Sequence, residues 1–195
     1  MAAEKYIVAT RENSFHIAVR NILNPSGYMF MGNSNDPLAL IRLIRSCSPD
    51  FVVIDLGIQW RELKNTLDTV DDEMLCACIL VGDYKDMEIA NILENSSVLS
   101  FCSKPVSSDK ILSVVEMANI NFKRVEQLNR KLKEVKDNYE SKKLIERAKY
   151  LLMERDNISE NEAYTSMRKK SMDLRISMKA LAEDIILIHK LNGKK

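Results

Sequence analysis

Residues 49–55 read Pro-Asp-Phe-Val-Val-Ile-Asp, a short apolar run that ends on the carboxylate of Asp55. Comparable apolar runs occur at 6–9, 28–31, 78–81 and 98–101. Runs that are continuously apolar, instead of alternating with polar residues, are typical of strands buried on both faces of a parallel sheet. We therefore expect five parallel strands, with Asp55 at the carboxyl end of one strand, where open α/β sheets bind ligands.

The segments between these runs have the apolar spacing of helices. Residues 14–23 and 86–95 each place their apolar side chains near one helix face. Another helix should begin at Asp36, which can cap it, with Pro37 at the first helical position. Alternating strands and helices predict a doubly wound α/β domain with right-handed crossovers over residues 1–121.

The pattern changes after residue 107. Pro105 is the last proline, and no glycine follows until Gly193, so a helix capped by Ser108 or Asp109 meets no stop for more than 40 residues. Its apolar residues recur at heptad spacing, with Asn121 on the same seam. They are Val125, Leu128, Leu132, Val135 and Tyr139. We favour a parallel dimeric coiled coil over 108–141; the alternative is one amphipathic helix that packs back on its own domain.

Residues 142–195 predict a third, all-α part built from three helices. The first should run over about 141–156, and the third over about 177–191, before Gly193. The second should begin near Ser159, because Ser159 and Glu162 match a capping box. Three short helices of this kind form a compact bundle.

Charge divides the chain unevenly. Residues 1–122 hold 10 Lys and Arg against 16 Asp and Glu, whereas 123–195 hold 19 against 12. A basic second half indicates a polyanionic partner, unless the charges segregate by chance. The four cysteines lack the spacing of a zinc site, and no apolar run approaches the ~20 residues of a membrane span. We expect reduced thiols, no membrane contact and a cytoplasmic location.

The first domain resembles the receiver domain of response regulators over about residues 4–120. The resemblance rests on Asp55 after its apolar run and on the sequence Phe101-Cys102-Ser103-Lys104-Pro105 after a later one. It implies that Asp55 accepts a phosphoryl group and that Lys104 pairs with the acyl phosphate. It also implies a cis peptide before Pro105, a switching aromatic at Phe101, and a role in two-component signalling.

Two parts of the receiver pattern are missing. Ala9-Thr10-Arg11-Glu12 replaces the acidic pair that holds Mg²⁺ in the family, and Val81-Gly82-Asp83 lacks the usual hydroxyl. Mg²⁺ prefers carboxylate oxygens, so we expect no cofactor. Two hypotheses remain for Asp55. In the first it is phosphorylated slowly, with Lys104 as counter-charge. In the favoured second it is a vestigial carboxylate paired with Lys104 or Arg11, in a domain that signals by protein contact or only dimerises.

The C-terminal part carries the most specific pattern. Residues 144–155 read LIERAKYLLMER, and the pattern continues through 158–173 and 181–186. It resembles the ANTAR domain, an RNA-binding module of bacterial transcription antitermination regulators, over about residues 142–190. The resemblance implies binding to paired hairpins with six-nucleotide loops in a leader RNA, which stops an overlapping terminator from forming.

Basic side chains that remain outside the predicted core of this bundle are the candidate RNA ligands. They are Arg147, Lys149, Arg155, Arg168, Lys169, Arg175 and Lys179, with Lys149, Arg168 and Arg175 as the strongest candidates. Two residues depart from the family pattern. Tyr150 stands where glycine is common, and we expect it to pack internally; Ser171 stands where alanine is usual.

These patterns predict an RNA-binding antitermination regulator that acts as a homodimer. A sensor kinase or another regulatory protein would act on its receiver-like domain. The alternatives are a DNA-binding response regulator, against which the lack of a clear helix-turn-helix counts, and a protein-interaction adaptor without nucleic-acid binding. An enzyme is not expected, because His16 and His189 are isolated and no nucleophile–base pair is recognisable.

Overall fold

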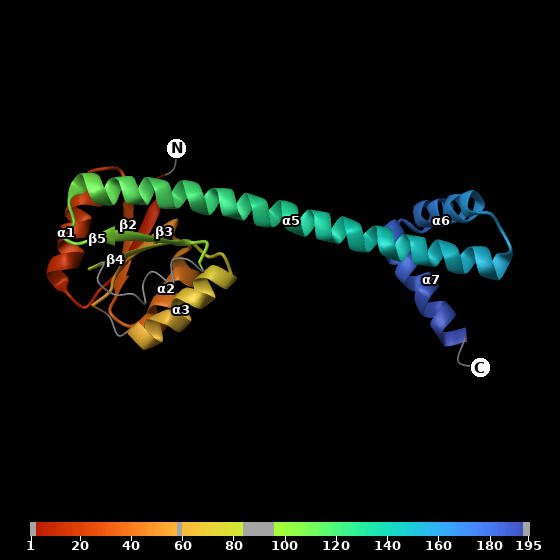
Figure 1. Ribbon diagram of the computed structural model, residues 1–195, viewed down its shortest axis with the longest axis horizontal. Helices are drawn as coiled ribbons and strands as arrows, with labels where there is room; N and C mark the ends of the chain where they lie inside the picture. Colours follow the sequence, from red (N-terminus) through yellow and green to blue (C-terminus); the bar gives the residue numbers. More distant parts are fainter. Residues whose placement is uncertain (1–2, 58–59, 84–95, 193–195) are drawn as a thin grey trace. The chain divides into compact units, whose positions relative to one another are not determined.

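The computed structural model describes residues 3–57, 60–83 and 96–192. The chain divides into two compact units, Met1–Leu128 and Asn129–Lys195, and the boundary lies within one long helix, α5 (Ser108–Asp156). Figure 1 shows the order of the elements. Within the described ranges, no helix is both long and apolar enough to span a lipid bilayer.

The first unit contains the five-stranded parallel sheet that the apolar runs predict. Its strands are β1 (Lys5–Ala9), β2 (Met29–Ser34), β3 (Phe51–Asp55), β4 (Ala77–Gly82) and β5 (Leu99–Ser103). The strand order is β2-β1-β3-β4-β5, and every neighbouring pair is parallel. The order doubles back at β1, and this arrangement places β1 beside β3 with their carboxyl ends at one edge.

Helices cover both faces of this sheet, as a doubly wound fold requires. α1 (Asn13–Leu23) and the start of α5 pack on one face. α2 (Pro37–Cys47) and α3 (Trp60–Asp72) pack on the other. Figure 1 shows these two layers on either side of the strands. The helices explain why the central strands β1, β3 and β4 read as continuous apolar runs, because these strands are covered on both faces, whereas the edge strands β2 and β5 are partly exposed.

Successive residues of a strand serve opposite faces. In β1, Tyr6 and Val8 join the cluster under α1 and α5, while Ile7 and Ala9 join the cluster under α2 and α3. All four side chains are fully buried. This alternation follows from the two-residue period of a strand.

Local signals placed α2 correctly, whereas α3 was missed. The Asp36 carboxylate accepts a hydrogen bond from the Ala39 amide at 2.7 Å, and Pro37 opens the helix, as predicted. α3 was not predicted, although Leu63, Leu67 and Val70, which it buries, have helical spacing. The helix predicted over 86–95 lies outside the described residues.

α5 is a single helix of 49 residues. The prediction of a helix without a stop is confirmed, but the separate helix expected to start near residue 141 is wrong. Because residues 108–156 contain neither glycine nor proline, the backbone has no reason to break there. The first helix of the C-terminal bundle is therefore the end of α5.

The second unit packs the end of α5 against α6 (Glu160–Leu174) and α7 (Met178–Asn192). Its core is small and aliphatic: Ala148, Leu152, Ala163, Met167, Leu181, Ala182 and Ile186. The predicted capping box is present, since Ser159 Oγ accepts from the Glu162 amide and the Glu162 carboxylate accepts from the Ser159 amide. α7 begins within one residue of its predicted start, and Ser177 Oγ accepts from the Ala180 amide.

The four cysteines are unpaired thiols, as expected. Cys76, Cys78 and Cys102 are buried, and Cys47 is half-buried. A hydrogen bond with Cys76 and burial raise the pKa of Cys78, and burial raises the pKa of Cys102. These three thiols pack as small apolar side chains of the first unit.

Candidate functional site

Three strand ends meet around one buried carboxylate. Asp55 ends β3, Thr10 directly follows β1, and Lys104 directly follows β5. Because all five strands are parallel, these positions lie at the same edge of the sheet. The Asp55 side chain is only 1% exposed, so its charge depends on protein partners and not on water.

Both oxygens of Asp55 accept hydrogen bonds. Lys104 Nζ lies 2.9 Å from Oδ1, and the Gly57 amide donates to the same oxygen at 3.3 Å. Thr10 Oγ1 donates to Oδ2 at 2.9 Å. Thr10 Oγ1 also accepts from the Glu12 amide at 3.0 Å, which fixes the hydroxyl. The carboxylate is thus held by an ammonium, a hydroxyl and a backbone amide.

Lys104 is bound to this carboxylate in the manner that the sequence indicated. The hydrogen bond to Asp55 raises the pKa of Lys104, and the nearby charges of Asp55, Glu12 and Asp83 act in the same direction. The peptide between Lys104 and Pro105 is cis, as the receiver resemblance implies. Phe101 is half-buried on β5, against the cluster under α2 and α3.

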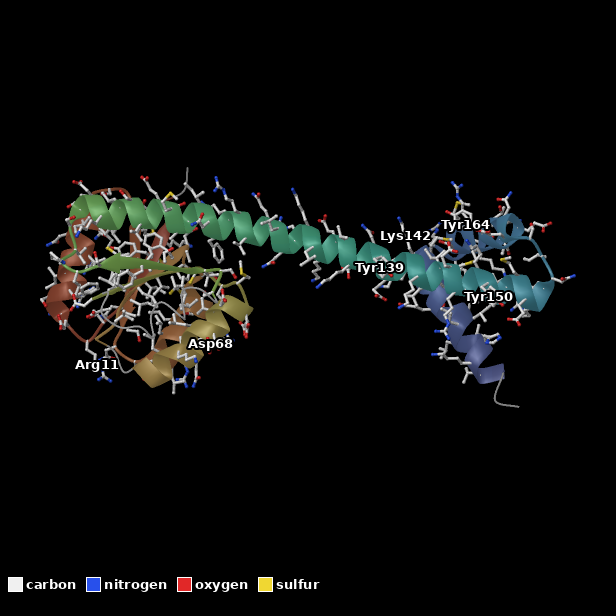
Figure 2. All side chains as sticks on the ribbon, viewed as in Figure 1. Arg11, Asp68, Tyr139, Lys142, Tyr150 and Tyr164 are labelled. Carbon is white, nitrogen blue, oxygen red and sulfur yellow. The ribbon has the colours of Figure 1, made fainter. Side chains whose placement is uncertain are left out.

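Of the two partners considered for Asp55, the structure selects Lys104. Arg11 is exposed and its side chain extends outward from the edge of the first unit (Figure 2). The position beside Asp55 belongs to Thr10, which is 2% exposed. The sequence showed that Thr10 brings no carboxylate, but it did not reveal that the hydroxyl would bind Asp55 directly.

A leucine occupies the space beside the position where the family has its hydroxyl. A Cβ atom added to Gly82 would lie 2.6 Å from Leu56 Cδ1 and 3.1 Å from Leu56 Cβ. Gly82 therefore permits the close approach of Leu56, the residue after Asp55. An apolar side chain stands where a hydroxyl would assist phosphoryl transfer, and only a structure could reveal this substitution.

The residues around Asp55 do not fit a Mg²⁺ ion. Mg²⁺ takes several oxygen ligands, usually including more than one carboxylate. Here the groups that contact the carboxylate are hydrogen-bond donors, and Lys104 brings a positive charge within 2.9 Å. The Glu12 amide donates to Thr10, and the charge of its carboxylate acts on Lys104.

The second unit exposes most of the predicted RNA ligands. Arg147, Arg155, Arg168, Lys169 and Arg175 are exposed, and Lys179 is half-buried. Arg168 lies in the middle of α6, and Arg175 is the C-cap residue of that helix. Neither guanidinium group forms an ion pair within the described ranges, so both remain available to a ligand.

Lys149 is the exception, and its expected place on the surface is wrong. The residue is 7% exposed, and its Nζ lies 2.7 Å from a Glu146 oxygen and 2.7 Å from a Glu160 oxygen. Hydrogen bonds to these two glutamates raise the pKa of Lys149. Since Glu160 begins α6, Lys149 connects α5 to the start of α6 through this ion pair.

Arg155 is exposed but has an intramolecular partner. Its Nε and Nη2 atoms donate to the two oxygens of Asp156, each at 2.7 Å. This contact lowers the pKa of Asp156, mainly through the Arg155 hydrogen bond. The net charge that Arg155 offers to a polyanion is correspondingly reduced.

The two departures from the ANTAR pattern have different outcomes. Internal packing was expected for Tyr150, and this prediction is wrong. The residue is 64% exposed on α5 (Figure 2). The face of α5 that packs in the core carries Ala148 and Leu152 instead. Ser171 is buried, and its Oγ donates to the Ile176 carbonyl at 2.6 Å, which steadies the turn between α6 and α7.

The apolar seam of α5 is exposed. Leu128, Leu132, Val135 and Tyr139 are 64%, 51%, 65% and 66% exposed. A run of large apolar side chains at heptad spacing remains uncovered in the single chain.

With this geometry in view, comparison with known proteins locates the second unit within a family. Residues 127–186 match the ANTAR domain. The chain therefore carries an ANTAR domain. The match covers the end of α5, all of α6 and most of α7, and it contains Lys149, Arg168 and Arg175.

Relatives of the ANTAR-containing chain are regulators. The chain is 21% identical over 182 residues to the transcriptional regulatory protein PdtaR of two Mycobacterium tuberculosis strains, CDC 1551 / Oshkosh and H37Rv. The alignment covers 93% of this chain and 89% of PdtaR. The ANTAR domain and its preceding sequence thus occur together in a regulatory protein of similar length.

Solved structures resemble the part that precedes the ANTAR domain. The receiver domain of a putative Luxo repressor protein from Vibrio parahaemolyticus is 14% identical, with a TM-score of 0.55 over 65% of this chain and 97% of that one. The receiver domain of the putative regulator NarL from Mycobacterium tuberculosis is 18% identical, with a TM-score of 0.53 over 60% and 98%. The first unit therefore has the fold of these receiver domains, and it precedes the residues that match the ANTAR domain.

Proposed function

We propose that this chain is a transcription antitermination regulator that binds hairpins of a leader RNA as a homodimer. The observation that carries the proposal is the ANTAR match at residues 127–186, on a unit with exposed arginines. The act is binding, so the proposal involves no catalytic turnover. A partner protein, for which a sensor kinase is one candidate, would act through the receiver domain.

Charge supports an RNA partner for the second unit. Residues 129–195 hold 17 Lys and Arg against 11 Asp and Glu. Arg168 and Arg175 present two guanidinium groups that can contact phosphates or stack on unpaired bases. Lys149 supports this surface from within, because it neutralises Glu160 at the start of α6.

The exposed seam of α5 supports the homodimer. Four large apolar side chains at heptad spacing bury little surface in one chain, and a parallel partner would cover them. Two ANTAR domains carried by one dimer could bind two hairpins of the same RNA. Once the first hairpin is bound, binding of the second hairpin would be intramolecular. The dimer would therefore bind the RNA more tightly than either ANTAR domain binds one hairpin.

The receiver domain is proposed to signal without phosphorylation of Asp55. The carboxylate is buried, is bound by Lys104 and Thr10, and has Leu56 beside it. Control by protein contact then replaces control by phosphate. The partner that makes this contact would be recognised at the surface of the first unit.

A binding experiment on the full-length chain tests the RNA partner. We expect an RNA with two tandem hairpins to bind more tightly than a DNA duplex of equal length. Binding should weaken steeply between about 50 and 200 mM salt, because phosphate contacts release counterions. Measuring the affinity over this range for both nucleic acids gives the slope and the preference together.

The same titration separates the alternative functions. Equal affinity for RNA and duplex DNA would favour a DNA-binding response regulator. If the chain binds neither at low salt, the nucleic-acid proposal fails and a protein-interaction adaptor remains. Sedimentation of the same samples reports whether the binding species is a dimer.

A further inference from the structure

All the aromatic rings of the second unit point outward. Residues 129–195 contain three tyrosines and neither phenylalanine nor tryptophan. Tyr139, Tyr150 and Tyr164 are 66%, 64% and 46% exposed, and the core of the unit is aliphatic. Burial of one ring contributes substantially to a core, so three exposed rings on a unit this small call for another role. Tyr139 already has one, because it lies on the heptad seam.

Tyr164 lies on one face of α6 together with Arg168, and Arg175 caps the C-terminal end of that helix. Tyr164, Arg168, Met172 and Arg175 follow one another at spacings of four, four and three residues, and all are exposed. We call these four residues the α6 stripe. Within the helix this spacing places neighbouring side chains about 5–6 Å apart, which brings together the ring of Tyr164, the guanidinium group of Arg168 and the thioether of Met172. Arg175 follows directly after the last helical residue, with a left-handed backbone, and adds a second guanidinium group at this end of α6.

The charge of the α6 stripe is positive along its length. No carboxylate lies three or four residues from Arg168 or Arg175 on the helix. Glu160 lies one turn before Tyr164, but its carboxylate is bound by Lys149 Nζ at 2.7 Å. Neither the Tyr164 hydroxyl nor the two guanidinium groups have a hydrogen-bond partner in the described part of the chain. The stripe therefore suits an anion that also offers a flat apolar face.

Tyr150 provides a contrast within the same unit. It is also exposed and helical, yet Glu154, which has no ion pair among the described residues, lies four residues after it. Glu146, four residues before Tyr150, is bound by Lys149 in the same way as Glu160. A phosphate backbone that approached Tyr150 would meet the Glu154 carboxylate. Both rings are exposed (Figure 2), but Tyr150 has an unpaired carboxylate one turn away, whereas Tyr164 has Arg168 there.

We infer that the α6 stripe is the RNA-reading surface of this chain, with the Tyr164 ring stacked on an unpaired loop base. Arg168 and Arg175 contact the phosphates on either side of that base. The inference rests on the proposed function and specifies its site. Stacking tolerates any base, so Tyr164 distinguishes loop from duplex, because only a loop offers an unstacked base.

The test uses the full-length chain and a defined RNA probe. The probe is a pool of hairpins with one constant stem and a random six-nucleotide loop, enriched on the wild-type protein. The comparison probe is the same stem as a blunt duplex without a loop. We expect Tyr164→Ala to weaken hairpin binding about tenfold while duplex binding changes less than about twofold. Tyr164→Phe, which keeps the ring, should bind as the wild type does.

Matched variants identify each contribution. Tyr150→Ala removes a ring that is more exposed than that of Tyr164 and should leave both affinities within about twofold of the wild type. Arg168→Ala should weaken hairpin and duplex binding alike and reduce the salt slope by about one, as expected for a phosphate contact. Tyr164→Leu, which keeps apolar bulk without an aromatic face, should behave like Tyr164→Ala.

Failure of this inference is distinguishable from failure of the proposed function. If the wild type binds hairpins and Tyr164→Ala binds them equally well, the assignment of the α6 stripe as the RNA-reading surface is wrong, and the proposal of an RNA-binding regulator is unaffected. Equal loss of hairpin and duplex binding in Tyr164→Ala also overturns stacking on a loop base. If the wild type binds no RNA, both fail.

Discussion

At the scale of single residues, Asp55 combines deep burial with complete hydrogen bonding. A buried carboxylate without partners would be costly, and here Lys104, Thr10 and the Gly57 amide supply them. The arrangement resembles a structural ion pair more closely than a site that awaits a phosphoryl group. Three consequences can be measured.

We expect a small phosphodonor with Mg²⁺ not to phosphorylate Asp55. The carboxylate is 1% exposed, and both its oxygens already accept hydrogen bonds. Intact mass after incubation should therefore show no stoichiometric addition of one phosphoryl group. A full addition that disappears in Asp55→Ala would show that the site remains an acceptor.

Removing the partner of Asp55 should destabilise the first unit. Lys104→Met leaves the buried carboxylate with only a hydroxyl and an amide, and about 2 kcal/mol of unfolding free energy should be lost. Lys110→Met, at an exposed position near the start of α5, is the control and should cost less than about 0.5 kcal/mol. Urea denaturation of both variants gives the comparison, and equal stability would mean that the pair does not support the fold.

The same ion pair predicts a dependence on alkaline pH. The pKa of Lys104 is raised above its ordinary 10.5, chiefly by the hydrogen bond to Asp55, so the folded state holds the proton more tightly. The stabilisation is complete below the unfolded pKa and is lost as pH rises through the folded pKa. The stability gap between wild type and Lys104→Met should therefore be constant from pH 7 to 9 and shrink above about 10.5. A gap that stays constant through this range would contradict the pairing.

At the scale of elements, helix ends depend on single side chains. Asp36 begins α2, and Ser159 with Glu162 begins α6 through a reciprocal pair of hydrogen bonds. Lys149 of α5 also forms an ion pair with Glu160, and this contact joins the first turn of α6 to α5. The orientation of the α6 stripe therefore depends on contacts at the start of α6.

Loss of the capping box should weaken α6. Ser159→Ala removes the acceptor for the Glu162 amide, and about 1 kcal/mol of stability should be lost. Thr165→Ala, an exposed substitution inside the same helix, should be neutral or slightly stabilising because alanine favours helices. Thermal denaturation followed by circular dichroism would compare them, and identical melting curves would argue against the cap.

At the scale of the whole molecule, the open question is the partner of the exposed seam. Leu128, Leu132, Val135 and Tyr139 lie on the part of α5 that joins the two compact units in sequence. A second copy of the chain would bury all four. The RNA-binding units would then be supplied in pairs.

A charge within the seam should prevent dimerisation. Leu132→Glu places like charges opposite each other in a parallel pair, so we expect a monomer in sedimentation at concentrations where the wild type is a dimer. Lys133→Glu changes charge at an exposed position outside the seam and should leave the dimer intact. The monomer should bind a tandem-hairpin RNA no more tightly than a single hairpin. A Leu132→Glu variant that remains dimeric would remove the seam from the interface.

Local patterns in the sequence sufficed for most elements of this protein. The apolar runs, the cap at Asp36, the capping box at Ser159 and the unbroken helix after Ser108 act over a few residues, and the structure contains them all. The motifs also placed the Asp55–Lys104 pair and the ANTAR domain. The helix α3 was missed because it buries only a few apolar side chains within a polar segment.

Other features were decided only by the tertiary structure. They depend on contacts between residues that are distant in the sequence and on which face of each helix packs in the core. Thr10 and Asp55 are 45 residues apart, and no local pattern indicates that their side chains meet. Leu56 over Gly82 is another such contact. Adjacent residues of α5 had opposite outcomes: Lys149 turned inward to two glutamates, while Tyr150 turned to solvent. A rotation of 100° per residue separates them, and the packing of the aliphatic core determined which one faces outward.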